Sequence, residues 1–101
     1  MNINIFEATQ IVNKKLESIG SNLGIRVNLI EGKTIEKEFY FIFFYNTELY
    51  LDSGNLSYSL VENSPIIVDK IIGKIHNTRT AHPIEFYIDE FEEKKFPYLS
   101  K

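Results

Sequence analysis

Residues Phe39 to Tyr45 read FYFIFFY, a run of apolar and aromatic side chains in a chain that is otherwise rich in charge. Successive side chains of a strand point to opposite faces, so this run predicts two apolar faces: Phe39, Phe41, Phe43 and Tyr45 on one, and Tyr40, Ile42 and Phe44 on the other. Such a strand needs cover on both faces. We expect helices of this chain to cover one face, and either the loop at 46–64 or a partner protein to cover the other.

The segments at the two ends of the chain have the spacing of amphipathic helices. Asn4 and Glu7 are spaced as a capping box, and Gly20, with the polar residues that follow it, favours a helix end. Pro83 suits the first turn of a second helix. Apolar residues at three- and four-residue intervals predict one buried stripe on each helix: Ile5, Ala8, Ile11, Val12, Leu16 and Ile19, then Ile84, Tyr87, Ile88 and Phe91.

Three further segments read as strands. IRVNLIEG at 25–32 alternates apolar and polar residues, as a half-buried strand does. PIIVDK at 65–70 and KIHNT at 74–78 flank Gly73, which suits the turn of a hairpin. Residues 46–64 carry a cluster of turn formers and weak periodicity, which predicts a long loop, with room for one short element.

Together these segments predict a single α+β domain over residues 1–101, in the order α-β-β-β-β-α. Apart from the long loop, the connections are too short for parallel crossovers, so the four-stranded sheet should be mainly antiparallel. We expect the N-terminal and the C-terminal helix to pack on one face of this sheet.

The composition excludes several classes of protein. The chain has no cysteine, so disulfides and thiolate metal sites are ruled out, and its net charge of −3 argues against nucleic acid as a partner. The N-terminus lacks the apolar stretch of a secretory signal, and no apolar run approaches the roughly 18 residues that cross a bilayer. The sequence therefore predicts a cytoplasmic protein with no membrane partner.

The sequence contains no motif typical of catalysis or phosphate binding. His76 and His82 are the candidate metal ligands, with Asp69 or Glu85 as companions, but one lies on a short strand and the other at a helix start. We interpret them as a strand-surface residue and a helix-entry residue. The sequence thus predicts no enzyme, no metal and no cofactor.

The last helix offers one candidate recognition surface. On a helical wheel Phe86 points away from the apolar stripe, into the sector that holds Asp89, Glu90 and Glu93. An exposed aromatic ring with carboxylates around it has the composition of an interface anchor with a charged rim. We therefore expect Phe86, Asp89 and Glu93 to bind a partner. The alternative is that the residues at 96–98 fold back over the Phe86 ring.

The long loop is the second candidate recognition surface. It combines aromatic rings and carboxylates on a segment that a rigid sheet would present to solvent, and the candidate partner-binding residues are Tyr50, Asp52, Tyr58 and Glu62. The alternative is that the two tyrosines close over the open face of the sheet.

The stretch ENSPIIVDKIIGKIHNTRTAHPIEFYIDEFE at 62–92, with FIFFYNTELY at 41–50, resembles the immunity protein 35 family, also known as the YrhB-like domain. The motif residues present here are Asn63, Pro65, Val68, Asp69, Gly73, Thr80, Ala81, Pro83, Glu85, Tyr87 and Ile88. Most of them specify strand starts, turns and caps, so the resemblance speaks for the fold first. Glu62 and Arg79 replace glycines of the family pattern, and Phe41 replaces a tryptophan, which predicts altered loop geometry near 62 and 79.

The resemblance implies a bacterial immunity protein, encoded beside a polymorphic toxin and protecting the cell by binding it. The leading hypothesis is a cytoplasmic immunity protein that neutralises its cognate protein toxin by direct stoichiometric binding through an acidic and aromatic surface. The alternative is a chaperone-like or homodimeric structural protein that uses the open aromatic face of the sheet. A homodimer is also left open under the first hypothesis.

Overall fold

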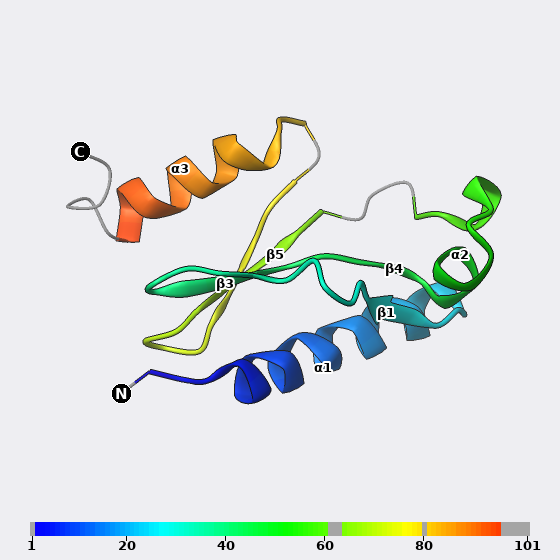
Figure 1. The fold of residues 1–101 in the computed structure, drawn as a ribbon, viewed down its shortest axis with the longest axis horizontal. Coiled ribbons are helices and arrows are strands. Elements are labelled where there is room, and N and C mark those ends of the chain that lie inside the picture. The colour runs from blue at the N-terminus through cyan, green and yellow to red at the C-terminus, as the bar shows by residue number, and fades with distance from the viewer. Residues whose placement is uncertain (1, 61–63, 80, 96–101) are drawn as a thin grey trace.

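The computed structural model describes residues 2–60, 64–79 and 81–95 (Figure 1). It is α+β with antiparallel sheets, as predicted. The elements are α1 (Ile5–Leu23), β1 (Val27–Leu29), β2 (Ile35–Glu36), β3 (Tyr40–Phe43), β4 (Tyr45–Thr47), α2 (Glu48–Ser53), a 3-10 turn η1 (Leu56–Tyr58), β5 (Ile66–Asp69), β6 (Ile75–Asn77) and α3 (Ile84–Lys95).

The strands form two sheets where the sequence predicted one of four strands. The aromatic run breaks at Phe44 into β3 and β4; β1 pairs with β4, and the larger sheet has the order β2-β3-β5-β6. All pairs are antiparallel. The segments 27–36 and 40–47 therefore form the two arms of one irregular hairpin, whose register changes between Leu29 and Ile35. The short strand β2 was not predicted.

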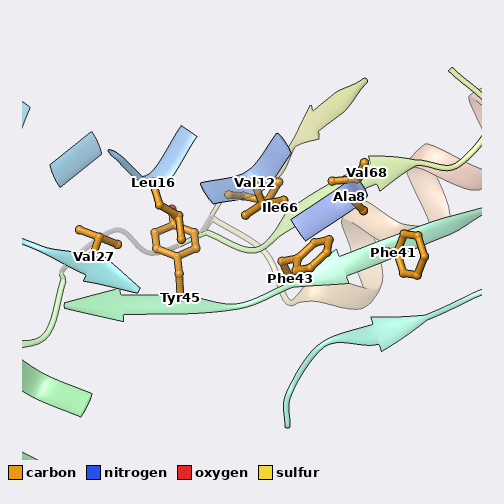
Figure 2. Packing of buried hydrophobic residues seen from close by; sticks show 9 residues of the cluster. All are labelled: Ala8, Val12, Leu16, Val27, Phe41, Phe43, Tyr45, Ile66 and Val68. Carbon is orange, nitrogen blue, oxygen red and sulfur yellow. The ribbon is translucent and has the colours of Figure 1, made fainter. Parts of the chain in front are cut away.

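One face of the strands packs against α1. The buried cluster on this side consists of Ala8, Val12, Leu16, Val27, Phe41, Phe43, Tyr45, Ile66 and Val68. Figure 2 shows Leu16 next to the Tyr45 ring and Val12 next to Ile66, so the stripe of α1 meets side chains of both sheets. The alternation predicted for the aromatic run is confirmed within the strands, because Phe41, Phe43 and Tyr45 share this face.

The other face is covered by α3, and the prediction that both helices pack on one face is wrong. Tyr40, Ile42, Ile67 and Phe91 form a second buried cluster, and Figure 1 shows α1 and α3 on opposite sides of β3 and β5. The cause is that β3 and β5 are both buried along their whole length, so each face needs a helix. Phe39 precedes β3 and packs with this second cluster, although the alternation predicted it on the same face as Phe41.

The two helices answer the question of what covers the aromatic run, and the loop and a partner protein are not needed for it. Tyr40 and Ile42 are almost completely buried under α3. Among the described residues, therefore, the sheet has no open aromatic face. The chaperone-like and homodimeric alternative was based on such a face, and this premise is wrong.

The start of α1 is confirmed and its end is not. The Asn4 side chain accepts from the Glu7 amide and the Glu7 carboxylate accepts from the Asn4 amide, which completes the predicted capping box. The helix continues past Gly20 to Leu23 and ends at Gly24, whose φ is 71°. Gly20 is instead a contact point, because a Cβ atom there would lie 2.4 Å from the carbonyl oxygen of Ile25.

The β5–β6 hairpin is confirmed. Gly73 has a φ of 68°, and its amide donates to the Asp69 carbonyl at 2.9 Å. The Asp69 carboxylate accepts from the amides of Ile71 at 2.8 Å and Ile72 at 3.2 Å. The carboxylate considered as a metal ligand therefore organises the turn.

Candidate partner-binding surfaces

The segment predicted to be a long loop is largely regular structure tied to β4. Asn46 is buried, and its side chain makes three hydrogen bonds. The amide oxygen accepts from the backbone of Thr47 at 2.8 Å and of Leu60 at 2.9 Å, and the amide nitrogen donates to the Ser59 hydroxyl at 3.0 Å. One buried side chain thus holds the chain after η1 against the strand before α2.

Thr47 adds a second tie. Its hydroxyl oxygen accepts from the Tyr50 amide at 3.0 Å, which caps the N-terminus of α2, and the same hydroxyl donates to the Tyr58 carbonyl at 2.7 Å. Gly54, with a φ of 71°, ends α2. The segment from β4 to η1 is therefore fixed by side chains that are themselves buried.

Large apolar side chains project from this fixed segment. Leu49 is 55% exposed, Leu56 77% and Tyr58 46%. Leu49 and Tyr58 line a hollow of about 490 Å³ whose other walls are Gly24, Ile25, Arg26, Thr47, Glu48 and Ser57. We call Leu49, Leu56, Tyr58 and this hollow the α2–η1 surface. Exposed apolar groups gathered beside a hollow are typical of a contact surface for a partner.

The structure places the predicted loop residues unevenly around this surface. Tyr58 is in it, Asp52 is exposed on α2, and Tyr50 is half-buried. Glu62 lies outside the described residues. Sequence reasoning missed Leu49 and Leu56. Thr47 before α2 and Gly54 after it are helix start and stop signals that could have revealed the helix that carries Leu49, and Asn55 is the corresponding cap before Leu56.

The rim of the α2–η1 surface is charged. The Glu48 carboxylate lies 3.9 Å from the Arg26 guanidinium and accepts from the Asn28 side chain at 3.2 Å. Arg26 is largely exposed, so this pair adds little to stability and leaves both charges available to a partner.

The second predicted surface lies on α3. Phe86 is 45% exposed, as the helical wheel predicted, and Asp89 and Glu93 are exposed on the same side of the helix. The Phe86 ring is 4.1 Å from the His82 ring, centroid to centroid, and 5.2 Å from the Tyr87 ring. The residues at 96–98, which were the alternative cover for Phe86, lie outside the described residues.

The two predicted surfaces do not meet. Figure 1 shows α2 at one end of the long axis, while α3 lies across the strands towards the other end. The extent along this axis is 42 Å. The six predicted residues that the structure describes therefore belong to two separate regions and do not form one site.

Both histidines pack against aromatic rings. His76, in β6, is half-buried with its ring centroid 5.0 Å from that of Phe91, and burial lowers the pKa of its imidazole, with Glu90 acting in the opposite direction. His82 is exposed and stacks on Phe86. Among the described residues no group of His, Asp and Glu side chains is arranged to hold a metal ion.

Comparison with known proteins identifies the family. The model of the family described as Immunity protein 35 matches residues 6–93, and the chain belongs to this family. A protein of Escherichia coli (strain K12), described as the uncharacterized protein YrhB, is 38% identical over 53 residues, which are 52% of this chain and 56% of that protein. The chain thus spans about half the length of this curated relative. No solved structure gives a significant match.

These matches confirm the resemblance that the motif residues indicated. Membership of an immunity protein family suggests neutralisation of a toxin as the general function. Within the described residues, no helix is both long and apolar enough to span a bilayer.

Proposed function

We propose that this chain is a cytoplasmic immunity protein that neutralises a cognate protein toxin by direct stoichiometric binding, without catalysis. Family membership supports the class of function. The α2–η1 surface supports the mode of action, since it offers apolar anchors to another macromolecule. We take this surface as the principal contact with the toxin.

The observation that carries the proposal is the fixed presentation of exposed apolar groups. The two buried side chains of Asn46 and Thr47 hold the segment that bears Leu56 and Tyr58. A surface that is ordered before binding loses less conformational entropy on association, so more of the contact energy appears as affinity. Tyrosine is also one of the residue types that contribute most to the binding energy of protein interfaces, and Tyr58 lies beside a hollow.

The α3 surface would serve as a secondary contact. Asp89 and Glu93 are exposed beside Phe86, and the whole chain carries a net charge of −3. Such a charge distribution accelerates association with a basic partner and has a smaller effect on the final affinity. We therefore expect this surface to influence the association rate more than the dissociation rate.

The test is co-expression with the toxin domain encoded beside the gene of this chain. We expect the chain to restore growth of cells that produce the toxin. With a catalytically inactive toxin domain, titration calorimetry should give a stoichiometry of one to one. Replacing Tyr58 by alanine should weaken binding by about 2 kcal/mol, or roughly 30-fold.

Phe86→Ala is the matched comparison, because the two rings are exposed to nearly the same degree, 46% for Tyr58 and 45% for Phe86. We expect the smaller loss of affinity for Phe86→Ala. The reverse order would make the α3 surface the principal contact. Absence of both protection and a complex would show that the proposed function is wrong, and light scattering of the free chain tests the homodimer.

A further inference from the structure

The outer edge of β1 is a row of backbone groups that no other described strand pairs with. The Arg26 carbonyl accepts from the Glu48 amide at 3.0 Å, and the Ile30 amide donates to the Phe44 carbonyl at 2.9 Å. In an antiparallel pair the bonded residues alternate, so the backbone groups of Val27 and Leu29 point away from β4. Among the described residues, no strand pairs with this edge.

The two edges of the larger sheet, β2 and β6, are better protected against pairing. Charged residues surround β2, namely Lys33, Glu36, Lys37 and Glu38, and the Glu36 carboxylate is paired with the Lys70 ammonium at 2.9 Å. Lys74 and Arg79 flank β6. Charges near an edge discourage unwanted strand addition. The segment 25–30 carries Arg26 as its one charged residue and is otherwise IVNLI, so β1 is the least protected of these three edges.

A second hollow runs beside this edge. It measures about 390 Å³ and lies between α1 and the start of β1, lined by Leu16, Glu17, Gly20, Ile25, Arg26, Val27 and Asn28. Ile25 and Arg26 also line the hollow of the α2–η1 surface, so the two hollows adjoin one short segment. Because Gly20 has no side chain, α1 lies close to the Val27 amide at the start of this edge.

We infer that β1 binds an extended segment of the toxin as an added strand, with alternate side chains of that segment entering the two hollows. Main-chain hydrogen bonds would supply affinity and the hollows would supply specificity, as in other cases of strand addition. The walls are mainly apolar, and their charged residues are Glu17 and the pair of Arg26 with Glu48, so that the carboxylates outnumber the one cation. The segment that fits is therefore mainly apolar and carries a basic residue.

This inference rests on the proposed function and adds the mode of recognition to it. The measurement is amide hydrogen exchange, followed by NMR, of the full chain alone and with the inactive toxin domain. In the free chain the Leu29 amide should exchange faster than the Asn28 amide, which faces β4. In the complex, exchange at Leu29 should slow by at least about tenfold.

Two variants of Leu29 separate the contribution of its backbone N–H group to binding from that of its side chain. Leu29→Pro removes the outward N–H group and is tolerated at an edge position, whereas Leu29→Ala keeps that group and loses the side chain. We expect the proline variant to bind the toxin domain at least about tenfold more weakly than the alanine variant, with thermal unfolding confirming that both fold.

The outcomes distinguish this inference from the proposed function. A complex that forms without added protection at Leu29 overturns the inference and leaves the proposed function standing, and equal affinities of two folded Leu29 variants do the same. A toxin domain that does not bind overturns both. If the proline variant does not fold, the exchange measurement on the unaltered chain decides.

Discussion

The hydroxyl of Tyr40, in β3, donates a hydrogen bond to the carboxylate of Glu92, in α3. The Tyr40 ring also packs edge-on against Phe91, with 5.0 Å between the ring centroids. Burial, and then the neighbouring Glu92 carboxylate, raise the pKa of the Tyr40 hydroxyl far above its usual range, so it remains a donor at any ordinary pH. This pair joins the C-terminal helix to the centre of the sheet.

Tyr40→Phe tests that connection. The substitution keeps the ring and removes the donor, leaving a partly buried carboxylate without its partner, so the free energy of unfolding should fall by about 1.5 to 3 kcal/mol. Urea denaturation measures the change. Tyr58→Phe, which removes an exposed hydroxyl, should change stability by less than about 0.5 kcal/mol. Equal effects of the two substitutions would contradict a structural role for the Tyr40 hydroxyl.

His76 should make the fold sensitive to acid. Burial against α3 lowers its pKa in the folded state, so below about pH 6.5, the value for an unperturbed histidine, the unfolded chain binds more protons than the folded chain. The free energy of unfolding should therefore decrease as the pH falls from about 6.5 through the folded-state pKa. His76→Phe keeps a ring against Phe91 and should flatten this dependence, as measured by denaturation at a series of pH values. An unchanged slope would place the effect elsewhere.

Gly20→Ala should destabilise the protein, although alanine usually favours a helix. The added Cβ atom would lie 2.4 Å from the carbonyl oxygen of Ile25, a backbone atom that cannot move without shifting β1. We expect a loss of more than about 1 kcal/mol in thermal unfolding, where an exposed helical glycine would gain about 0.5 to 1 kcal/mol. Ser21→Ala, at an exposed position of the same helix, is the control and should be neutral or slightly stabilising.

Asn46→Ala should loosen the α2–η1 surface. The substitution leaves the Leu60 amide and the Ser59 hydroxyl without their partner, at a cost of about 2 to 3 kcal/mol. Exchange of the Leu60 amide should accelerate, and toxin binding should weaken although the residue is buried. Asn55→Ala removes an exposed cap of η1 and should cost about 1 kcal/mol at most. Unchanged exchange at Leu60 would show that other contacts hold the segment.

The sequence correctly predicted the features that depend only on residues close together in the chain. The Asn4 and Glu7 capping box, the Gly73 hairpin and the outward position of Phe86 all depend on residues a few positions apart, and all three are present. The helix end predicted at Gly20 was wrong because it was also judged from neighbouring residues alone. A glycine that ends a helix and a glycine that admits a neighbouring backbone look alike in sequence, and the position of Ile25 decides between them.

The candidate surfaces were less predictable because they depend on distant contacts. Asn46 binds groups 13 and 14 residues away, and nothing in its own neighbourhood marks it as an anchor. The prediction that both helices cover one face overlooked β5. Like β3, β5 is buried along its whole length, so each face of the sheet needs a covering helix. The sequence alone therefore could not show that the predicted residues on α2 and η1 lie in a different region from those on α3.

The ties of Asn46 and Thr47 have a consequence for how this protein can diversify. They hold η1 through backbone groups and the small Ser59 hydroxyl, and none of them involves the outward side chains of Leu56 or Tyr58. Those two side chains can change without disturbing the segment that carries them. A lineage could thus acquire protection against a new toxin by exchanging a few outward side chains while the interior stays as it is.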